Sequence, residues 1–200
     1  MSGFNNELVL PKDKHKVVYN GDFRDMGVLQ ARYGNSLVND LGSGDVLGIH
    51  DAVLNNGTHI HIATIATVLK NVQTGATIGA KTWTTGKKTE YANFINLIFI
   101  VNGTDAMSDW NGNVTFDSSN ITGAPVANYI VRYGDRLYTD DTTKRLRVHK
   151  SSIPTASAIT WDTTTGFFDV EGSGDFITGL HAARNTLMVF TNEDVEIRYF

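Results

Sequence analysis

An all-β fold is predicted for this chain of 200 residues, and the prediction rests on three observations. Gly, Thr and Asn are plentiful while charged residues make up only 19% of the chain, a balance that favours strands and turns over helices. The hydrophobic residues show almost no 3.6-residue periodicity. Four similar segments, each with two apolar halves around a tight polar turn, follow one another: residues 50–64, 90–103, 126–141 and 177–192.

Each of the four segments has the pattern of a β-hairpin. Asn and Gly adopt a positive φ at little cost, as the tight turns of hairpins require. Within the second segment, the apolar stretch 94–102 is expected to contain a strand that is buried on both faces. The predicted turns are Asn56-Gly57, Asn96, Gly134-Asp135 and Arg184-Asn185.

Further short strands are expected between the hairpins. Val195, Ile197 and Tyr199 alternate with charged residues, as in a strand that is half exposed. These additional strands are expected at residues 81–86, 145–151, 167–172 and 194–200.

A unit of about four short strands that recurs roughly every 40–50 residues is typical of a β-propeller blade. We therefore predict a propeller-like array of short antiparallel strands, with a β-sandwich as the competing architecture. Four blade starts in 200 residues correspond to a small or incomplete ring. Because the last predicted strand reaches Phe200 with no closing segment, we expect ring closure to need residues beyond this chain.

The N-terminal part of the sequence differs from the repeat. Residues 1–24 are predicted to form an extended N-terminal arm with a local basic cluster at 12–16, and residues 25–200 the propeller-like domain. Within that domain, residues 27–38 are expected to form one or two strands. Because the apolar residues 8–10 can add a strand to an exposed sheet edge, we expect the arm to clasp an adjacent subunit.

Charge and composition exclude several function classes. The formal net charge of −4 provides no basic surface for direct nucleic-acid recognition, and the absence of Cys excludes a disulfide framework. The N-terminal residues lack the apolar core of a signal peptide, and no apolar run approaches the roughly 20 residues of a membrane helix. We expect a soluble protein that is not exported.

His59 and His61 form the pattern that most resembles a metal site. Two residues apart in a strand, they lie on one face, and His-x-His is a known metal spacing. His50 and Asp51 lie one predicted strand away. No further ligand follows at a fixed spacing, so we interpret the two His as the exposed face of a half-buried strand with Ile60 and Ile62 inward. No metal, cofactor or catalytic residue is predicted.

Loop carboxylates and sequons are interpreted as parts of turns. Asp105 and Asp109 lack the middle ligand of a calcium loop, and Asp140 and Asp141 are assigned to a turn in the same way. Trp110 is expected to pack back on its blade. Without a signal peptide, glycosylation is not expected at the sequons that begin at Asn56, Asn102, Asn113 and Asn120.

The sequence also lacks local enzyme signatures: it has no G-x-S-x-G, no phosphate-binding Gly loop and no H-E-x-x-H. Asp169 and Glu171 come nearest to a glycosidase carboxylate pair, but they are expected to alternate outward on a strand. We therefore predict that the chain is not an enzyme. A carbohydrate-binding or glycoside-hydrolysing β-propeller is the alternative.

Five phrases, in order from about residue 25 to the C-terminus, resemble bacteriophage neck and tail-nozzle (tail tubular or stabilisation) β-propeller virion proteins. The first phrase is GVLQARYGN followed by LGSGDVLGIHDAV, and the second is FINLIFIVNGTDAMSDWNGN. The third is ITGAPVANYIVRYGDRLYTDD. The fourth and fifth are RLRVHKSSIPTASAITWD and DFITGLHAARNTLMVFTNEDVEIRYF.

The resemblance implies a structural virion protein of a tailed phage, made in the host cytoplasm. It would be one subunit of a homo-oligomeric tail or neck (nozzle) ring that joins the portal-adaptor side to the distal tail. The implied partners are other copies of the chain, adaptor or portal proteins, and tail or fibre proteins. The genome would pass through the lumen without sequence-specific contacts, so we expect a neutral to acidic lumen. This chain departs from the family in length, since the family members run well beyond 200 residues.

Overall fold

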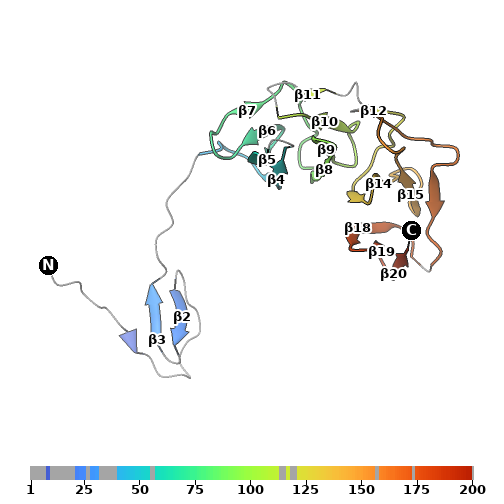
Figure 1. The fold of residues 1–200 in the computed structure, drawn as a ribbon. Helices are drawn as coiled ribbons and strands as arrows, with labels where there is room; N and C mark the ends of the chain where they lie inside the picture. The colour runs from blue at the N-terminus through green and yellow to red at the C-terminus, as the bar shows by residue number, and fades with distance from the viewer. Residues whose placement is uncertain are drawn as a thin grey trace. The chain divides into compact units, whose positions relative to one another are not determined.

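The computed structural model shows a chain built from strands (Figure 1). It describes residues 40–199 except 55–56, 113–115, 118–120, 156–157 and 173, together with three strands nearer the N-terminus. Contacts divide the chain into two units, residues 1–37 and residues 38–200. The predicted all-β class is confirmed, since every element of the described residues is a strand. In that part of the chain no helix is long and apolar enough to span a membrane.

The N-terminal unit holds a small antiparallel sheet with the order β1-β3-β2. Its strands are β1 (Leu8–Val9), β2 (Gly21–Asp25) and β3 (Val28–Ala31). The predicted arm of residues 1–24 thus includes β1 and most of β2, and the rest of it lies outside the described residues. Leu8 pairs with Leu29 and Val9 with Val28, so the apolar segment pairs here with a strand of its own unit. Its role as a clasp on an adjacent subunit stays a prediction.

The second unit contains four successive antiparallel sheets, which we call blades 1 to 4, each with its strands in chain order (Figure 1). Blade 1 contains β4 (Val46–Val53), β5 (His59–Ile65), β6 (Val68–Asn71) and β7 (Thr77–Ile78). Blade 2 contains β8 (Glu90–Phe94), β9 (Leu97–Val101), β10 (Ser108–Trp110) and β11 (Phe116–Asp117).

Blade 3 has four strands, whereas the described part of blade 4 has three. Blade 3 contains β13 (Ile130–Tyr133), β14 (Arg136–Asp140), β15 (Arg147–Lys150) and β17 (Phe167–Asp169). Blade 4 contains β18 (Ile177–Ala183), β19 (Thr186–Thr191) and β20 (Val195–Arg198). A short parallel pair joins β12 (Ile121–Thr122) and β16 (Ile159–Thr160).

The hydrophobic core lies between the blades, and β9 shows why. All five of its residues are buried, as predicted for a strand with two covered faces. Because side chains alternate along a strand, Ile98 and Ile100 pack toward blade 1, while Leu97, Phe99 and Val101 pack toward blade 3. A third cluster, which includes Tyr138 and Leu187, joins blades 3 and 4. Each inner blade is therefore held on both sides by apolar contacts.

The four predicted hairpins are confirmed, and each joins the first two strands of a blade. Asn96 has a φ of 63°, and Gly134 and Arg184 have φ values of 60° and 50°. These are the left-handed conformations that tight hairpin turns need. Gly57 has a φ of 78°, while Asn56 lies outside the described residues.

The additional strands are confirmed in three of four cases, as β15, β17 and β20. The strand expected at residues 81–86 is wrong, since that segment connects blade 1 to blade 2 without strand pairing. β7 already occupies the fourth position of blade 1. The apolar character of the segment comes from Trp83, whose side chain is buried in the cluster between blades 1 and 2. The backbone N–H of Trp83 donates to Thr67 O at 2.8 Å.

Candidate functional site

The first strands of the blades lie next to one another. Each stands at one edge of its sheet, and β4 contacts β8, β8 contacts β13, and β13 contacts β18. They are therefore the inner strands of the blade array. The charged residues on these four strands are Asp51, Glu90 and Arg132.

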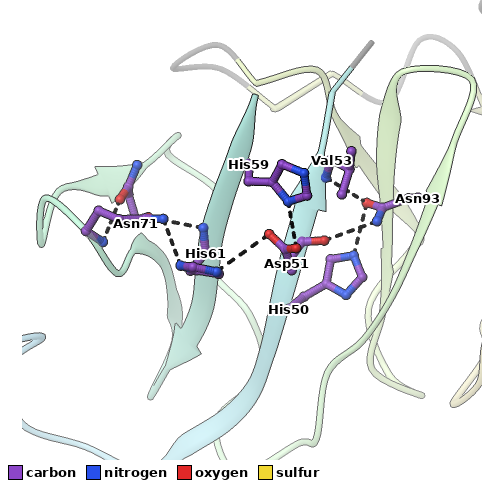
Figure 2. Close-up of polar contacts among 8 residues, drawn as sticks. His50, Asp51, Val53, His59, His61, Asn71 and Asn93 are labelled. Atoms are coloured by element: carbon purple, nitrogen blue, oxygen red, sulfur yellow. Dashed lines mark hydrogen bonds and ion pairs between the residues drawn. The ribbon is translucent and has the colours of Figure 1, made fainter. Parts of the chain in front are cut away.

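A polar network joins two of these inner strands (Figure 2). His50 Nε2 lies 3.0 Å from Asn93 Oδ1, and Asn93 Nδ2 donates to the Asp51 carbonyl oxygen at 3.1 Å. The His50 ring also stacks on Tyr91 of β8, with ring centroids 5.3 Å apart and planes 9° from parallel. Asn93 thus links blade 2 to the side chain of His50 and to the backbone of Asp51, and this network helps to hold blade 1 against blade 2.

Asp51 and the two predicted His residues meet on the opposite side of β4 (Figure 2). Asp51 pairs with His61 across the β4–β5 ladder, and its carboxylate lies 2.8 Å from His59 Nδ1 and 3.7 Å from His61 Nε2. The hydrogen bond from His59 lowers the pKa of Asp51. Gln73 Nε2 contacts His61 Nδ1 at 2.9 Å, which orients the second ring. The expected arrangement is confirmed: both His are exposed and Ile62 is buried.

The His59–Asp51–His61 cluster is open to solvent, with side chains that are 46–59% exposed. Such a cluster can donate and accept hydrogen bonds. Within the described ranges, no group of three or more His, Asp or Glu side chains has an arrangement that could hold a metal ion. The expectation that the chain binds no metal stays a prediction.

A hollow of 620 Å³ lies beside the network, between the start of β4 and the segment that leads into β8. Its polar wall is formed by Lys88 and Glu90, whose charged groups are 2.5 Å apart. Gly48 lies at its floor, where an added Cβ would be 2.5 Å from Thr89 O. The hollow therefore depends on a close approach of β4 to the segment before β8.

Asn102 and Asp105 of the NGTD segment act in a turn, as predicted. Asn102 Oδ1 accepts hydrogen bonds from the N–H groups of Thr104 and Asp105, while Asn102 Nδ2 donates to Asp105 at 2.6 Å. Burial opposes ionisation of Asp105, but hydrogen bonds from Thr84 and Asn102 outweigh it and lower the pKa. The Asn102 side chain of this sequon is buried, and both of its polar atoms form hydrogen bonds within the protein. The other three sequon Asn residues lie outside the described residues.

Asp140 holds the segment that leads into blade 3. Its carboxylate accepts hydrogen bonds from the backbone N–H groups of Asn128 and Tyr129 and from Asn128 Nδ2, at 2.7–2.8 Å. Burial raises the pKa of Asp140. In blade 4, Asn192 Oδ1 accepts from the N–H of Asp175 at 2.7 Å. In blades 3 and 4, a polar side chain at or just after the end of the second strand thus holds the chain that enters the blade, and in blade 2 Asp105 holds Thr84 in a similar way.

The assignment of all four carboxylates to loops is wrong in two cases. Asp109 lies within β10, fully buried opposite Phe99, and Asp140 is the buried last residue of β14. Asp141 does lie in a turn and contacts the buried His149 at 3.1 Å. The local sequence pattern predicts turns at these carboxylates, whereas the burial of Asp109 depends on the strands that lie beside it. Trp110, as predicted, packs back on its blade.

Asp169 does not have the environment of a catalytic acid. It lies on β17 and forms a bidentate pair with Arg147, at 2.6 and 2.8 Å. The hydrogen bond from Arg147 lowers the pKa of Asp169, whereas a general acid needs a raised one. Glu171 follows β17, and its N–H donates to Glu196 of β20 at 2.9 Å. Both residues therefore act at the contact between blades 3 and 4.

Sequence reasoning missed the link between His50 and Asn93. The two residues are 43 positions apart, and neither belongs to a recognisable motif. The one available signal was their position on the first strands of successive repeats, where equivalent positions come close in space.

The comparisons with known proteins support the fold alone. The designed Ika4 protein superposes with a TM-score of 0.56 and 12% identity, over 84% of this chain and 99% of that one. BamB from Moraxella catarrhalis gives 0.49 and 15%, over 75% of this chain and 42% of BamB. The designed Ika8 protein gives 0.45 and 12%, over 77% and 48%. No family model matches the sequence, and no curated protein matches it. The blades and the Ika4 likeness define a β-propeller-like protein.

Proposed function

We propose that the chain is a structural virion protein of a tailed bacteriophage and forms one subunit of a multi-copy tail or neck ring. The phage assignment rests on the order of the five sequence phrases described above. The ring assignment rests on one structural observation: the apolar faces at both ends of the blade array are exposed. Ile49 of blade 1 is 68% exposed and Ile197 of blade 4 is 48% exposed, which is unfavourable unless another surface covers them.

The inner strands support passage of the genome through such a ring. Asp51 lies on the side of β4 that faces away from blade 2, so the other charged residues on the described inner strands are one carboxylate, Glu90, and one guanidinium, Arg132. A wall that is neutral to acidic does not grip phosphates as a basic wall does. In this role the ring connects adaptor or portal proteins on one side to tail or fibre proteins on the other.

The test is to purify particles of the phage that encodes the chain and to probe gradient fractions for the protein. We expect the protein to sediment with tailed particles, and particles made without its gene to lack a functional tail. A protein that is absent from particles would contradict the proposal. If the same protein bound defined oligosaccharides on a glycan array as a monomer, the carbohydrate-binding alternative would replace it.

A further inference from the structure

Exposed apolar side chains gather at the two ends of the blade array. Among the described residues, eight large hydrophobic side chains are exposed, and six of them lie on or beside the strands β4 and β20. These six are Val46, Ile49, Val53, Val195, Ile197 and Tyr199. Such clustering marks a contact surface, since single exposed apolar residues are normally scattered.

On blade 1, the exposed residues share the face that points away from blade 2. Ala52 packs into the cluster between blades 1 and 2, so Asp51 and Val53, its neighbours on the strand, point to the other side. Ile49 lies on that outer face as well, 68% exposed. A register shift between Val46 and Gly48 brings Val46 to the same side, opposite Ile65. We call this surface of blade 1 the first end face.

On blade 4, the alternation of β19 and β20 produces a second apolar surface. Leu187 and Val189 point into the cluster between blades 3 and 4. Their neighbours Met188 and Phe190 therefore point outward, and they pair with Ile197 and Val195. The charged residues of β20, Glu196 and Arg198, pair with the inward residues and face blade 3. We call the outward surface of blade 4 the second end face.

The two end faces have the composition of the contacts that already join the blades. Each of the three contacts inside the array is an apolar cluster between two facing sheets. The second end face offers Phe190, Val195 and Ile197. The first offers Val46, Ile49 and Val53 beside the polar Asp51–His59–His61 cluster, much as the contact between blades 1 and 2 adds the His50–Asn93 network to its apolar cluster. The two faces do not cover each other within one chain, because Ile49 and Ile197 are 68% and 48% exposed.

We propose that the second end face of one copy packs on the first end face of a second copy, and that two copies close one ring of eight blades. A contact between two different surfaces makes a closed ring only when the rotation closes. Propellers typically have about 4–8 blades, so two copies of four blades reach the upper end of this range and three copies would exceed it. This contact specifies how copies meet in the assembly proposed above, and in that respect it rests on the proposed function.

The test measures the mass of the full chain in solution by native mass spectrometry and by sedimentation. We expect a species of twice the chain mass of 21.9 kDa. The substitutions Ile49→Glu and Ile197→Glu each place a charge in the proposed contact and should weaken dimerisation by at least about tenfold. The matched control is Ile153→Glu, because Ile153 is 53% exposed but lies outside both end faces. Circular dichroism checks folding, and Val195→Glu replaces any Ile197 variant that does not fold.

A mixing experiment tests whether the contact joins two different faces. When the Ile49→Glu and Ile197→Glu chains are combined, the mixed pair has one contact without a substitution, so it should form in preference to either homodimer. A dimer weakened only by Ile197→Glu would mean that two second end faces meet, and would overturn the proposal. Unaltered dimerisation of both variants, open polymers, or a monomeric native chain would overturn it as well. A monomer in solution that is present in multiple copies in tails would refute this contact and leave the proposed function intact.

Discussion

Substitution of Gly48 by Ala tests the junction of blades 1 and 2. The added Cβ would lie 2.4 Å from Thr89 Oγ1, 2.5 Å from Thr89 O and 2.8 Å from Tyr91 Cε2. The Thr89 hydroxyl can rotate away, but the Thr89 carbonyl is part of the backbone. The backbone cannot move easily at this point, because the Thr89 N–H donates to Leu47 O at 2.9 Å. Overpacking of this kind destabilises a protein by about 1–3 kcal/mol.

Gly179→Ala is the matched control for this substitution. Gly179 also lies in the first strand of a blade, beside a register shift, yet an added Cβ there would meet only Phe190, at 3.7 Å. Both substitutions reduce the entropy of the unfolded chain, which stabilises by about 0.4–1 kcal/mol and cancels when the two variants are compared. Gly48→Ala should therefore be about 1–3 kcal/mol less stable than Gly179→Ala, or lower in Tm by about 2–12 °C.

The assay is urea unfolding followed by tryptophan fluorescence, with thermal unfolding by circular dichroism as a second probe. Equal stability of the two Ala variants would refute the close approach of β4 to Thr89. It would also remove the physical reason for a Gly at position 48.

Three further outcomes are expected. Phe99→Ala should lower the free energy of unfolding by about 3–5 kcal/mol, because Phe99 is fully buried between blades 2 and 3. Phe176→Ala, at a side chain that is 42% exposed, should change it by less than about 1 kcal/mol, and denaturant titration of both variants tests the difference. Asp140→Asn should destabilise by about 1–3 kcal/mol, since one carboxylate oxygen that accepts hydrogen bonds becomes a donor, and a neutral result in the same titration would contradict its holding role. Asp169 has a folded-state pKa below the unfolded value of about 3.9, so its contribution to stability is present above that pH and is lost as the pH falls through the folded pKa. Asp169→Asn should therefore reduce the acid sensitivity of unfolding, and an unchanged pH profile would mean that the pair with Arg147 does not form in solution.

Local patterns predicted most of the fold. The turn at Asn96 and the doubly buried strand β9 follow from residue types a few positions apart, because turn conformation and strand alternation are short-range properties. The segment 81–86 misled the prediction because an apolar Trp83 can be buried from a connection as well as from a strand.

The site depended on contacts that the sequence does not encode locally. Alternation in β20 showed a half-exposed strand, but only the packing of blade 4 on blade 3 reveals that its apolar side faces outward. The His50–Asn93 contact likewise depends on the register of two sheets and on the way in which they meet. Pairing within a blade can be inferred from sequence spacing, whereas contacts between blades require the position of each sheet.

The most direct measurement of the proposed role is the copy number of the chain in purified phage particles, obtained by quantitative mass spectrometry against a capsid protein of known number. We expect a fixed number of copies per particle that is greater than one and is even, as pairs of chains would give. A chain that is absent from the particles, or present as a single copy, would contradict its role as a ring subunit.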